Sequence, residues 1–236
     1  MSKNLRSNVL FESNSGLIQI GEELYGIHRV DYPLGGISKR IFDLAFSVTA
    51  ILLTLPIFVV TAMAVKFADG GPILFIQPRI GFNGQPFPCL KFRTMCVDAE
   101  ARLKEHLLAN TSAAEEWAST RKLKKDPRLT LIGGSLRRAS LDELPQFFNV
   151  LRGEMSIVGP RPVVAEEVTR YGRDASAYLS TRPGVTGAWQ VSGRSDLSYS
   201  ERVRLDAEYC ATWSFFKDIQ IVLKTVPALF LTRGSY

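Results

Sequence analysis

The sequence predicts an α+β membrane protein of the monotopic type, whose membrane helix enters and leaves through the same leaflet. Three observations predict this fold class. Residues 41–65 form a 25-residue apolar stretch with a proline near its middle, two strand-like runs follow between residues 72 and 95, and helical periodicity dominates much of the rest. We therefore expect a re-entrant membrane helix, a small β-hairpin and a helical cytosolic domain with amphipathic helices at the membrane interface.

Length and composition are consistent with one globular domain carried by a membrane segment. We divide the 236 residues into a variable N-terminal segment, 1–36, a re-entrant helix, 37–67, and a cytosolic domain, 68–236. The net charge of +6 indicates an anionic partner such as nucleic acid, a phosphate-bearing substrate or an anionic membrane face. The three cysteines have neither disulfide nor metal-ligand spacing, which favours a reducing compartment.

Re-entry is inferred from a proline and from flanking charges. A straight helix over the apolar stretch would be about 37 Å long, which exceeds the hydrocarbon thickness of a bilayer. Pro56 removes a backbone hydrogen bond near its middle, so we expect a bend there, with the hydroxyl of Thr49 or Thr54 bonded to the freed carbonyls. Basic residues at 39–40 and at 66 make both ends favour the cytoplasmic side. A true crossing remains the alternative.

Turn and capping signals predict the next elements. Asn83-Gly84, between the two strand-like runs, predicts the β-hairpin. Residues 98–124 show helical spacing of leucines among many charges. Ser198 and Glu201 form a capping box, which predicts a helix that continues through Trp213.

The C-terminal stretch, 218–231, is apolar apart from Asp218 and Lys224. One interpretation is an amphipathic helix that lies on the membrane surface. The other is a C-terminal helix that closes the hydrophobic core, and the sequence favours neither.

Two adjacent acids, Asp142 and Glu143, are the candidate catalytic residues. Ser140 and Glu143 have capping-box spacing, so one interpretation is that the acids only begin a helix. Pro145 would then occupy a helical position that requires a donor, so the helix is expected to begin one or two residues later. In either register the acids lie at the positive end of the helix dipole, which suits a carboxylate nucleophile and an anionic substrate.

Basic residues surround the two acids. Between residues 121 and 161 nine basic side chains outnumber four acidic ones, and Arg137, Arg138 and Arg161 flank the acid pair. A guanidinium group can bind two phosphate oxygens at once. An ionised carboxylate can attack phosphorus. Glu143 is a hard oxygen donor that suits Mg²⁺ bridging a diphosphate. Nucleic acid would explain the charge but not the apolar stretch, so we expect no nucleic-acid partner.

Four motifs resemble those of one family. They are KRIFD at 39–43, KFRTM at 91–95, SLDELPQFFNVLRGEMSIVGPRP at 140–162 and RPGVTGAWQVSGR at 182–194. From about residue 39 onwards the chain therefore resembles the bacterial sugar transferases, the monotopic phosphoglycosyl transferases, and most of all the undecaprenyl-phosphate galactose phosphotransferases of exopolysaccharide synthesis. The family's helix break often reads Ser-Pro, whereas this chain has Leu55-Pro56.

The resemblance implies a reaction and a set of site residues. The expected reaction transfers hexose 1-phosphate from a UDP-sugar to undecaprenyl phosphate and releases UMP, at the cytoplasmic face of the bacterial inner membrane. It would use Mg²⁺ and a covalent phosphosugar–aspartate intermediate. By motif position Asp142 is the nucleophile, and Asp142 and Glu143 contact the metal ion. The residues expected to contact phosphate or nucleotide are Lys91, Arg93, Arg137, Arg161, Arg182 and Arg194.

The sequence leaves three questions open. Glucose or an N-acetylhexosamine could replace galactose, because no position distinguishes such sugars without a structure. The oligomeric state does not follow from the residues, and a homodimer is one arrangement left open. From another functional class, a catalytically silent, membrane-attached scaffold that binds nucleotide sugars would also explain the basic cluster and the membrane helix.

Overall fold

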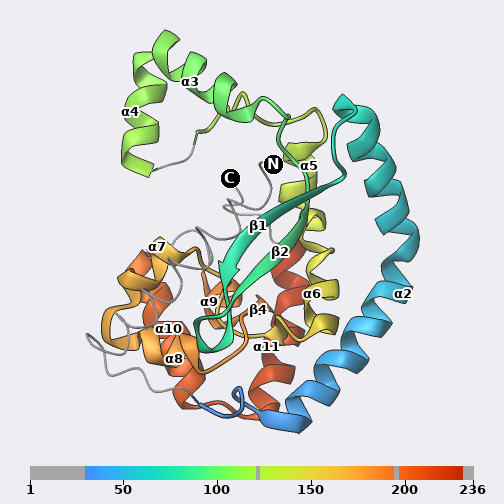
Figure 1. Cartoon of the computed structure of the whole chain (residues 1–236), viewed down its shortest axis with the longest axis vertical. Helices are drawn as coiled ribbons and strands as arrows, with labels where there is room; N and C mark the ends of the chain where they lie inside the picture. Colours follow the sequence, from blue (N-terminus) through green and yellow to red (C-terminus); the bar gives the residue numbers. More distant parts are fainter. Residues whose placement is uncertain (1–29, 121–122, 194–196, 231–236) are drawn as a thin grey trace, which may run out of the picture.

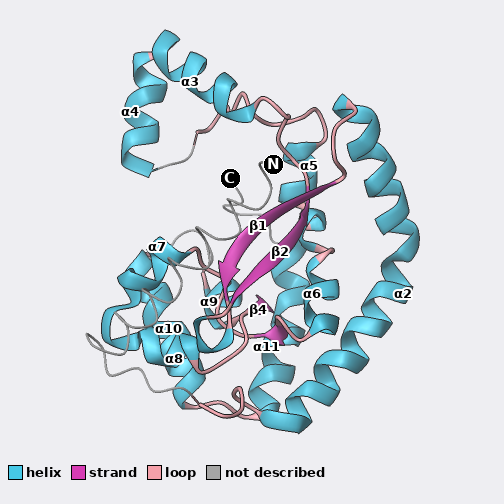
Figure 2. Ribbon diagram, viewed as in Figure 1, coloured by secondary structure: helices cyan, strands magenta, loops and turns pink. Residues whose placement is uncertain are grey.

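The computed structural model describes residues 30–120, 123–193 and 197–230. Helices and strands are mixed, as expected of an α+β chain, and the strands form two small sheets (Figures 1 and 2). Most of the expected N-terminal segment lies outside the described residues. In chain order the elements are α2 (Gly36–Asp69), β1 (Leu74–Ile80), η1 (Phe82–Gly84), β2 (Pro86–Phe92), α3 (Ala99–Ala109), α4 (Thr111–Thr120), α5 (Gly133–Arg138), η2 (Leu141–Glu143), α6 (Gln146–Arg152), β3 (Ser156–Val158), α7 (Ala165–Val168), η3 (Thr169–Asp174), α8 (Ala175–Leu179), β4 (Gly184–Thr186), α9 (Ala188–Ser192), α10 (Tyr199–Ala211) and α11 (Phe215–Phe230).

Helix α2 reverses the usual pattern of a helix in water. Its buried side chains include Lys39, Asp43 and Ser47, whereas apolar side chains such as Leu52 and Leu53 are 65% and 76% exposed. Among the described residues it is the one helix long and apolar enough to cross a membrane, and 11% of its most apolar window is buried. Such a surface is stable in lipid rather than in water, so the packing of α2 supports the predicted membrane association.

The proline of α2 does not interrupt the helix. α2 continues through Pro56, and Figure 1 shows one curved helix along the side of the domain. Thr49 and Thr54 each donate to the carbonyl four residues earlier, at 2.9 and 2.7 Å. The carbonyl that loses its usual donor to Pro56 is that of Leu52. The expected role of the threonines is therefore wrong, while the re-entrant path stays a prediction.

The predicted β-hairpin is present. β1 and β2 pair antiparallel, with Phe75 opposite Lys91. Asn83, at φ 52°, supplies the left-handed residue expected of an Asn-Gly turn. Because side chains alternate along a strand, Gln77, Arg79 and Lys91 project from the same face of the hairpin.

A second, parallel strand pair does not follow from the sequence patterns. β3 and β4 place Ser156 beside Gly184. Glycine is required for this contact, because a Cβ on Gly184 would lie 2.1 Å from the amide nitrogen of Gly159. A Cβ on Gly159 would lie 2.5 Å from the carbonyl oxygen of Arg182. The GPRP and RPGVTG motifs are therefore in direct contact.

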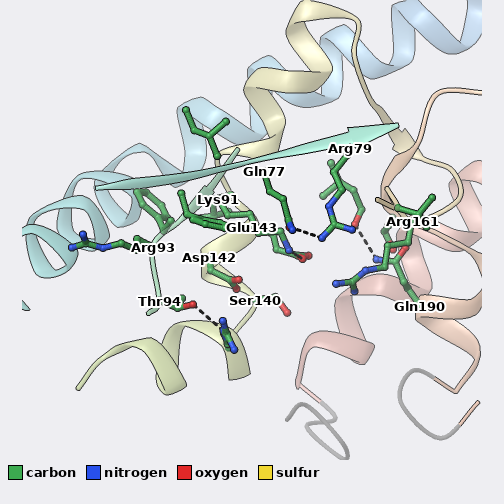
Figure 3. Close-up of a pocket in the computed structure, with 18 of the residues that line it drawn as sticks. Gln77, Arg79, Lys91, Arg93, Thr94, Ser140, Asp142, Glu143, Arg161 and Gln190 are labelled. Atoms are coloured by element: carbon green, nitrogen blue, oxygen red, sulfur yellow. Dashed lines mark hydrogen bonds and ion pairs between the residues drawn. The ribbon is translucent and has the colours of Figure 1, made fainter. Parts of the chain in front are cut away.

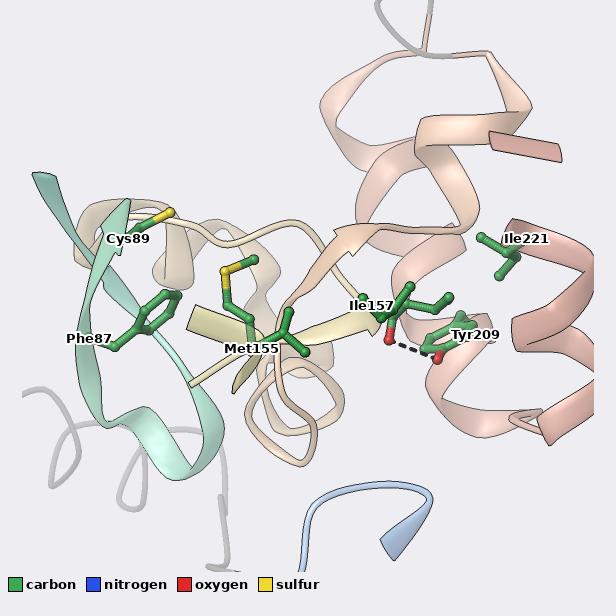
Figure 4. Packing of buried hydrophobic residues seen from close by; sticks show 8 residues of the cluster. Phe87, Cys89, Met155, Ile157, Tyr209 and Ile221 are labelled. Atoms are coloured by element: carbon green, nitrogen blue, oxygen red, sulfur yellow. Dashed lines mark hydrogen bonds between the residues drawn. The ribbon is translucent and has the colours of Figure 1, made fainter. Parts of the chain in front are cut away.

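The main hydrophobic core lies where the hairpin, α6, β3, α10 and α11 meet (Figure 4). Close packing there sets the position of the hairpin relative to the C-terminal helices. Cys89 is a packing residue of this core, 1% exposed. The buried members are Phe87, Cys89, Val150, Met155, Ile157, Val158, Tyr209 and Ile221.

Buried polar contacts join the start of α2 to the C-terminal helices. Lys39, 3% exposed, donates to Asp218 and to the hydroxyl of Tyr209. Asp218 is fully buried and also accepts from Tyr209 at 2.6 Å and from the indole of Trp213 at 3.0 Å. Both members of the Lys39–Asp218 ion pair thus have further hydrogen-bond partners within the domain.

The KRIFD motif also bonds to the central elements. Arg40 donates to two carbonyls at the end of α6, at 2.6 and 2.9 Å. Asp43 accepts from the hydroxyl of Ser156 and the amide of Ile157, both at 2.9 Å. The motif therefore docks the membrane helix onto α6 and β3.

Helix α11 closes the hydrophobic core, which was one of the two interpretations of the C-terminal stretch. Asp218 and Ile221 on its inner side are buried. Phe216 and Leu223 on its outer side are 83% and 67% exposed, so contact with the membrane stays a prediction for this helix.

Helix α10 begins at the predicted capping box, in which Ser198 accepts from the amide of Glu201. It ends at Ala211, two residues earlier than expected. Its inner side carries Asp206, 2% exposed, which accepts from the hydroxyl of Tyr171 at 3.1 Å. Burial raises the pKa of Asp206 to about 7.

Removing the cation of the buried ion pair should destabilise the protein. Lys39→Met would leave Asp218 buried without its partner, so we expect the free energy of unfolding to fall by about 3–5 kcal/mol. Lys224→Met, on the exposed side of α11, is the matched control and should be neutral. Thermal unfolding in detergent measures the difference, and equal melting temperatures for the two variants would contradict a stabilising role for the pair.

The raised pKa of Asp206 should make stability depend on pH. An unfolded chain binds this proton only below about pH 4, so the stabilisation is complete there and is lost as the pH rises through the folded-state pKa. Asp206→Asn keeps an acceptor for Tyr171 and removes the titration. Relative to wild type, its melting temperature should rise between about pH 5 and pH 8, and a constant difference would refute the assignment.

Candidate active site

A cavity of about 1510 Å³ lies between the hairpin, the acid-bearing turn and helices α9, α10 and α11. Asp142, Glu143, Lys91, Arg137 and Arg161 all line it. Figure 3 shows both acids below the hairpin strand β1. The structure thus brings together five of the residues that were predicted for the site.

The acids lie on a short 3₁₀ turn, η2, between α5 and α6. Ser140, just before this turn, has φ 54°, a left-handed conformation that is uncommon for residues with a Cβ. Its side chain makes no capping bond, so the predicted capping box at Ser140 is wrong. Helix α6 begins later than expected, at Gln146, because Pro145 lacks an N–H and is accommodated at the helix start.

Glu143 is paired with a lysine. Lys91, from β2, donates to the Glu143 carboxylate at 2.6 Å. Burial pushes the pKa of Glu143 upward, but the charges of Lys91 and Arg161 outweigh burial and hold the pKa below its ordinary value. Glu143 is therefore the ionised member of the acid pair, and the charge of Lys91 balances its negative charge.

Asp142 is in a different environment, with 9% of the residue exposed. Burial and the charge of Glu143 raise the pKa of Asp142 to about 6, against the opposing charges of Lys91 and Arg137. A carboxylate with this pKa is still mostly ionised at neutral pH and is more basic than an ordinary aspartate. Neighbouring acids whose pKa values are pushed apart are typical of sites where the two acids have different tasks.

Two adjacent arginines of α5 differ in their surroundings. Arg137 donates from Nε to the hydroxyl of Thr94 at 2.9 Å, lines the cavity and influences the pKa of Asp142. Arg138 is exposed and bonds to Ser135 within its own helix, at 3.3 Å. Of the two arginines, Arg137 is therefore the one that lines the cavity.

Arg79 is a cavity residue that sequence analysis missed. It donates to the carbonyl of Pro162 at 3.1 Å and to Gln77 at 2.7 Å, as Figure 3 shows in part. The first bond supports the loop that carries Arg161. The available signal was the two-residue spacing of Gln77 and Arg79, but their position beside Lys91 depends on the hairpin register.

Aromatic rings line the cavity beyond the acids. The guanidinium groups of Arg161 and Arg202 lie 5.9 and 4.8 Å from the ring centre of Trp189. Tyr199 lines the same cavity. Rings and guanidinium groups in this arrangement suit the faces of a base or a sugar.

Three other predicted residues are placed differently. Arg93 lines the cavity but pairs with Asp69 at the end of α2, and Figure 3 shows its side chain directed away from the acids. Arg182 donates to a carbonyl just after α6 at 2.7 Å and is not a lining residue. Arg194 lies outside the described residues. Their expected contacts with phosphate or nucleotide stay predictions.

Two adjacent carboxylates have the chemistry expected of a magnesium ion shared with substrate, and Mg²⁺ stays a prediction. Within the described part of the chain, no group of three or more His, Cys, Asp or Glu side chains could hold a metal ion by itself. Mg²⁺, however, is commonly held by one or two carboxylates together with substrate phosphates and water. Burial first, and then the charge of Glu143, raise the pKa of Asp142, and a bound divalent cation would relieve the repulsion between the two acids.

The chain is similar to named sugar-phosphate transferases. It is 53% identical over 204 residues to the exopolysaccharide production protein ExoY of Sinorhizobium fredii, covering 86% of this chain and 90% of that protein. It is 44% identical over 198 residues to the undecaprenyl-phosphate galactose phosphotransferase of Salmonella typhimurium, covering 84% of this chain and 41% of that protein. It is 38% identical over 229 residues to the UDP-glucose:undecaprenyl-phosphate glucose-1-phosphate transferase of Escherichia coli, covering 91% of this chain and 46% of that protein.

The family model described as bacterial sugar transferase matches residues 34–232. The match begins just before α2 and therefore includes the membrane helix, the hairpin, the acid-bearing turn and the C-terminal helices. On this evidence the chain belongs to the bacterial sugar transferase family.

Proposed function

We propose that the protein transfers galactose 1-phosphate from UDP-galactose to undecaprenyl phosphate and releases UMP, as the first membrane step of exopolysaccharide synthesis. The observation that carries the proposal is one cavity that contains Asp142 and Glu143 together with Lys91, Arg137 and Arg161. This cavity belongs to a domain docked on a helix with an exposed apolar surface. The names of the relatives support the same class of reaction.

Asp142 is the proposed nucleophile. One carboxylate oxygen attacks the β-phosphorus of the UDP-sugar, the bond from phosphorus to the bridging oxygen breaks, and UMP leaves with the bonding electrons. The hexose phosphate is then bound to Asp142 through a phosphorus–oxygen bond. A phosphate oxygen of the lipid acceptor attacks the same phosphorus, which frees the carboxylate and forms the lipid diphosphate sugar. Both nucleophiles are ionised, so neither step requires a general base.

Basic groups from separate elements balance the charge of this reaction. Arg137 comes from α5, Lys91 from β2 and Arg161 from the loop after β3. Positive groups around one phosphorus stabilise the charge that spreads over its oxygens during transfer. Mg²⁺ held by Asp142 and Glu143 would add neutralisation of the diphosphate.

The cellular location follows from the two proposed substrates. The acceptor has its chain in lipid and its phosphate at the interface, whereas the UDP-sugar is water-soluble. A domain fixed to α2 can meet both at the membrane surface. We therefore place the protein at the cytoplasmic face of the bacterial inner membrane.

The choice of galactose rests on the relatives. Three whose names specify galactose, from Salmonella typhimurium, Erwinia amylovora and Streptococcus agalactiae, are 44%, 46% and 41% identical to this chain. Two whose names specify glucose, from Komagataeibacter xylinus and Escherichia coli, are 40% and 38% identical. Galactose is accordingly the first sugar to test.

Release of UMP tests the proposed reaction. Detergent-solubilised protein with undecaprenyl phosphate and Mg²⁺ should release UMP from UDP-galactose faster than from UDP-glucose. A preference for UDP-glucose would reassign the sugar. Release from no UDP-sugar would exclude the transferase and favour the nucleotide-sugar-binding scaffold.

Replacing the nucleophile should abolish the reaction. Asp142→Asn is expected to lower UMP release by at least about 10³-fold, because an amide does not replace the ionised carboxylate as a nucleophile. Labelled phosphosugar should be trapped on the wild type and on the exposed control Asp174→Asn, but not on Asp142→Asn. A covalent label that persists in Asp142→Asn would place the nucleophile elsewhere.

The two arginines of α5 provide a matched pair. Arg137→Lys keeps the charge but loses the planar fork that can bond Thr94 and phosphate together, so kcat/KM should fall about 10–100-fold. Arg138→Lys should leave kcat/KM unchanged. Equal losses in steady-state assays of the two variants would contradict the assignment of Arg137 to the site.

A further inference from the structure

Part of the lining of the cavity that contains the acids is an apolar surface beside α11. It is formed by side chains from four elements that are distant in sequence. We call this surface the apolar arm, and it consists of Phe46 of α2, Phe147 of α6, Val185 of β4, and Val222 and Val226 of α11. An aliphatic chain would gain more from an apolar surface of this kind than a nucleoside diphosphate sugar, most of whose groups are polar.

The apolar arm begins close to the reacting group. Phe147 follows Glu143 by four residues, across the junction between η2 and α6. Leu144, between them, also lines the cavity. Leu144 and Phe147 therefore continue the lining of the cavity from the acids to the apolar arm.

The walls of the apolar arm are held together. Thr225 of α11 and Thr186 of β4 are hydrogen-bonded at 2.8 Å, next to Val226 and Val185. The rings of Phe46 and Phe147 lie 6.4 Å apart between their centres. The arm is thus a preformed surface rather than a gap between separate helices.

The apolar arm opens to the outside at α11. Val226 lines the cavity and is also 56% exposed. On the other side, Phe46 belongs to the membrane helix, whose neighbouring residue Val48 is 47% exposed. A chain that leaves the arm therefore meets apolar surface rather than charged surface.

We propose that the apolar arm binds the first isoprene units of the polyprenyl phosphate acceptor, so that the lipid reaches Asp142 between α6 and α11. The UDP-sugar occupies the part of the cavity beside Arg161 and Trp189. After UMP has left, the acceptor phosphate attacks the phosphorus of the sugar phosphate bound to Asp142, and the carboxylate is released. This inference rests on the proposed function, and it assigns a binding surface to the second substrate.

Two variants of adjacent residues test the arm. Val222→Trp fills it, whereas Leu223→Trp places the same ring on the exposed side of α11. For undecaprenyl phosphate, kcat/KM should fall at least about tenfold in Val222→Trp, because the indole occupies the space of the chain. It should be unchanged in Leu223→Trp. Exchange of labelled UMP into UDP-galactose requires no acceptor and should be unchanged in both variants.

The assays separate the two levels of the proposal. Loss of exchange together with transfer in Val222→Trp, or equal transfer in the two variants, would overturn the assignment of the arm. A wild-type protein that performs neither exchange nor transfer would refute the proposed function instead.

A binding experiment tests where the isoprenyl chain lies without requiring turnover. A photoreactive isoprenyl phosphate should label wild-type peptides that contain Phe147 or Val222, with less label in Val222→Trp than in Leu223→Trp. Label confined to the exposed middle of α2 would overturn the inference.

Discussion

The buried ion pair between Lys39 and Asp218 is the contact on which the rest of the structure depends. A membrane helix cannot be held to its domain mainly by its apolar side chains when these face lipid, because lipid solvates them equally well. The domain instead holds the polar side of α2 through hydrogen bonds of Lys39 and Arg40 and through one carboxylate oxygen of Asp43. Because the polar side of α2 binds the domain, its apolar side stays free to contact lipid.

The docking of α2 extends to the active site through a short series of contacts. Asp43 holds β3, β3 pairs with β4, and the loop after β3 carries Arg161. Arg79 supports that loop from the hairpin, which also supplies Lys91. The helix that determines the position of the protein at the membrane is therefore connected to the basic groups around the acids. Variants at the docking residues should consequently be judged for activity as well as for stability.

The pKa values of the two acids are shifted in opposite directions by their surroundings rather than by their own chemistry. Glu143 faces Lys91 and keeps a low pKa, whereas Asp142 is buried beside that charged neighbour and has a raised one. A turn brings them to the cavity, because the left-handed Ser140 and the following Pro145 postpone the start of α6. The helix-start interpretation and the catalytic interpretation are therefore separable in the structure, although the letters Ser-x-x-Glu suggested both.

Local patterns in the sequence alone determined the apolar helix, the hairpin with its Asn-Gly turn, the capping box of α10 and the order of the family motifs, because each depends on neighbours within a few residues. The motifs also predicted the two acids and most of the basic residues that line the cavity. Only the tertiary structure decided that β3 pairs with β4, that Arg79 joins the site, that Arg93 turns to Asp69 and that part of the cavity lining is apolar. These features join residues far apart in the chain, and their positions follow from close packing and from the burial of charge, which no short stretch of sequence contains.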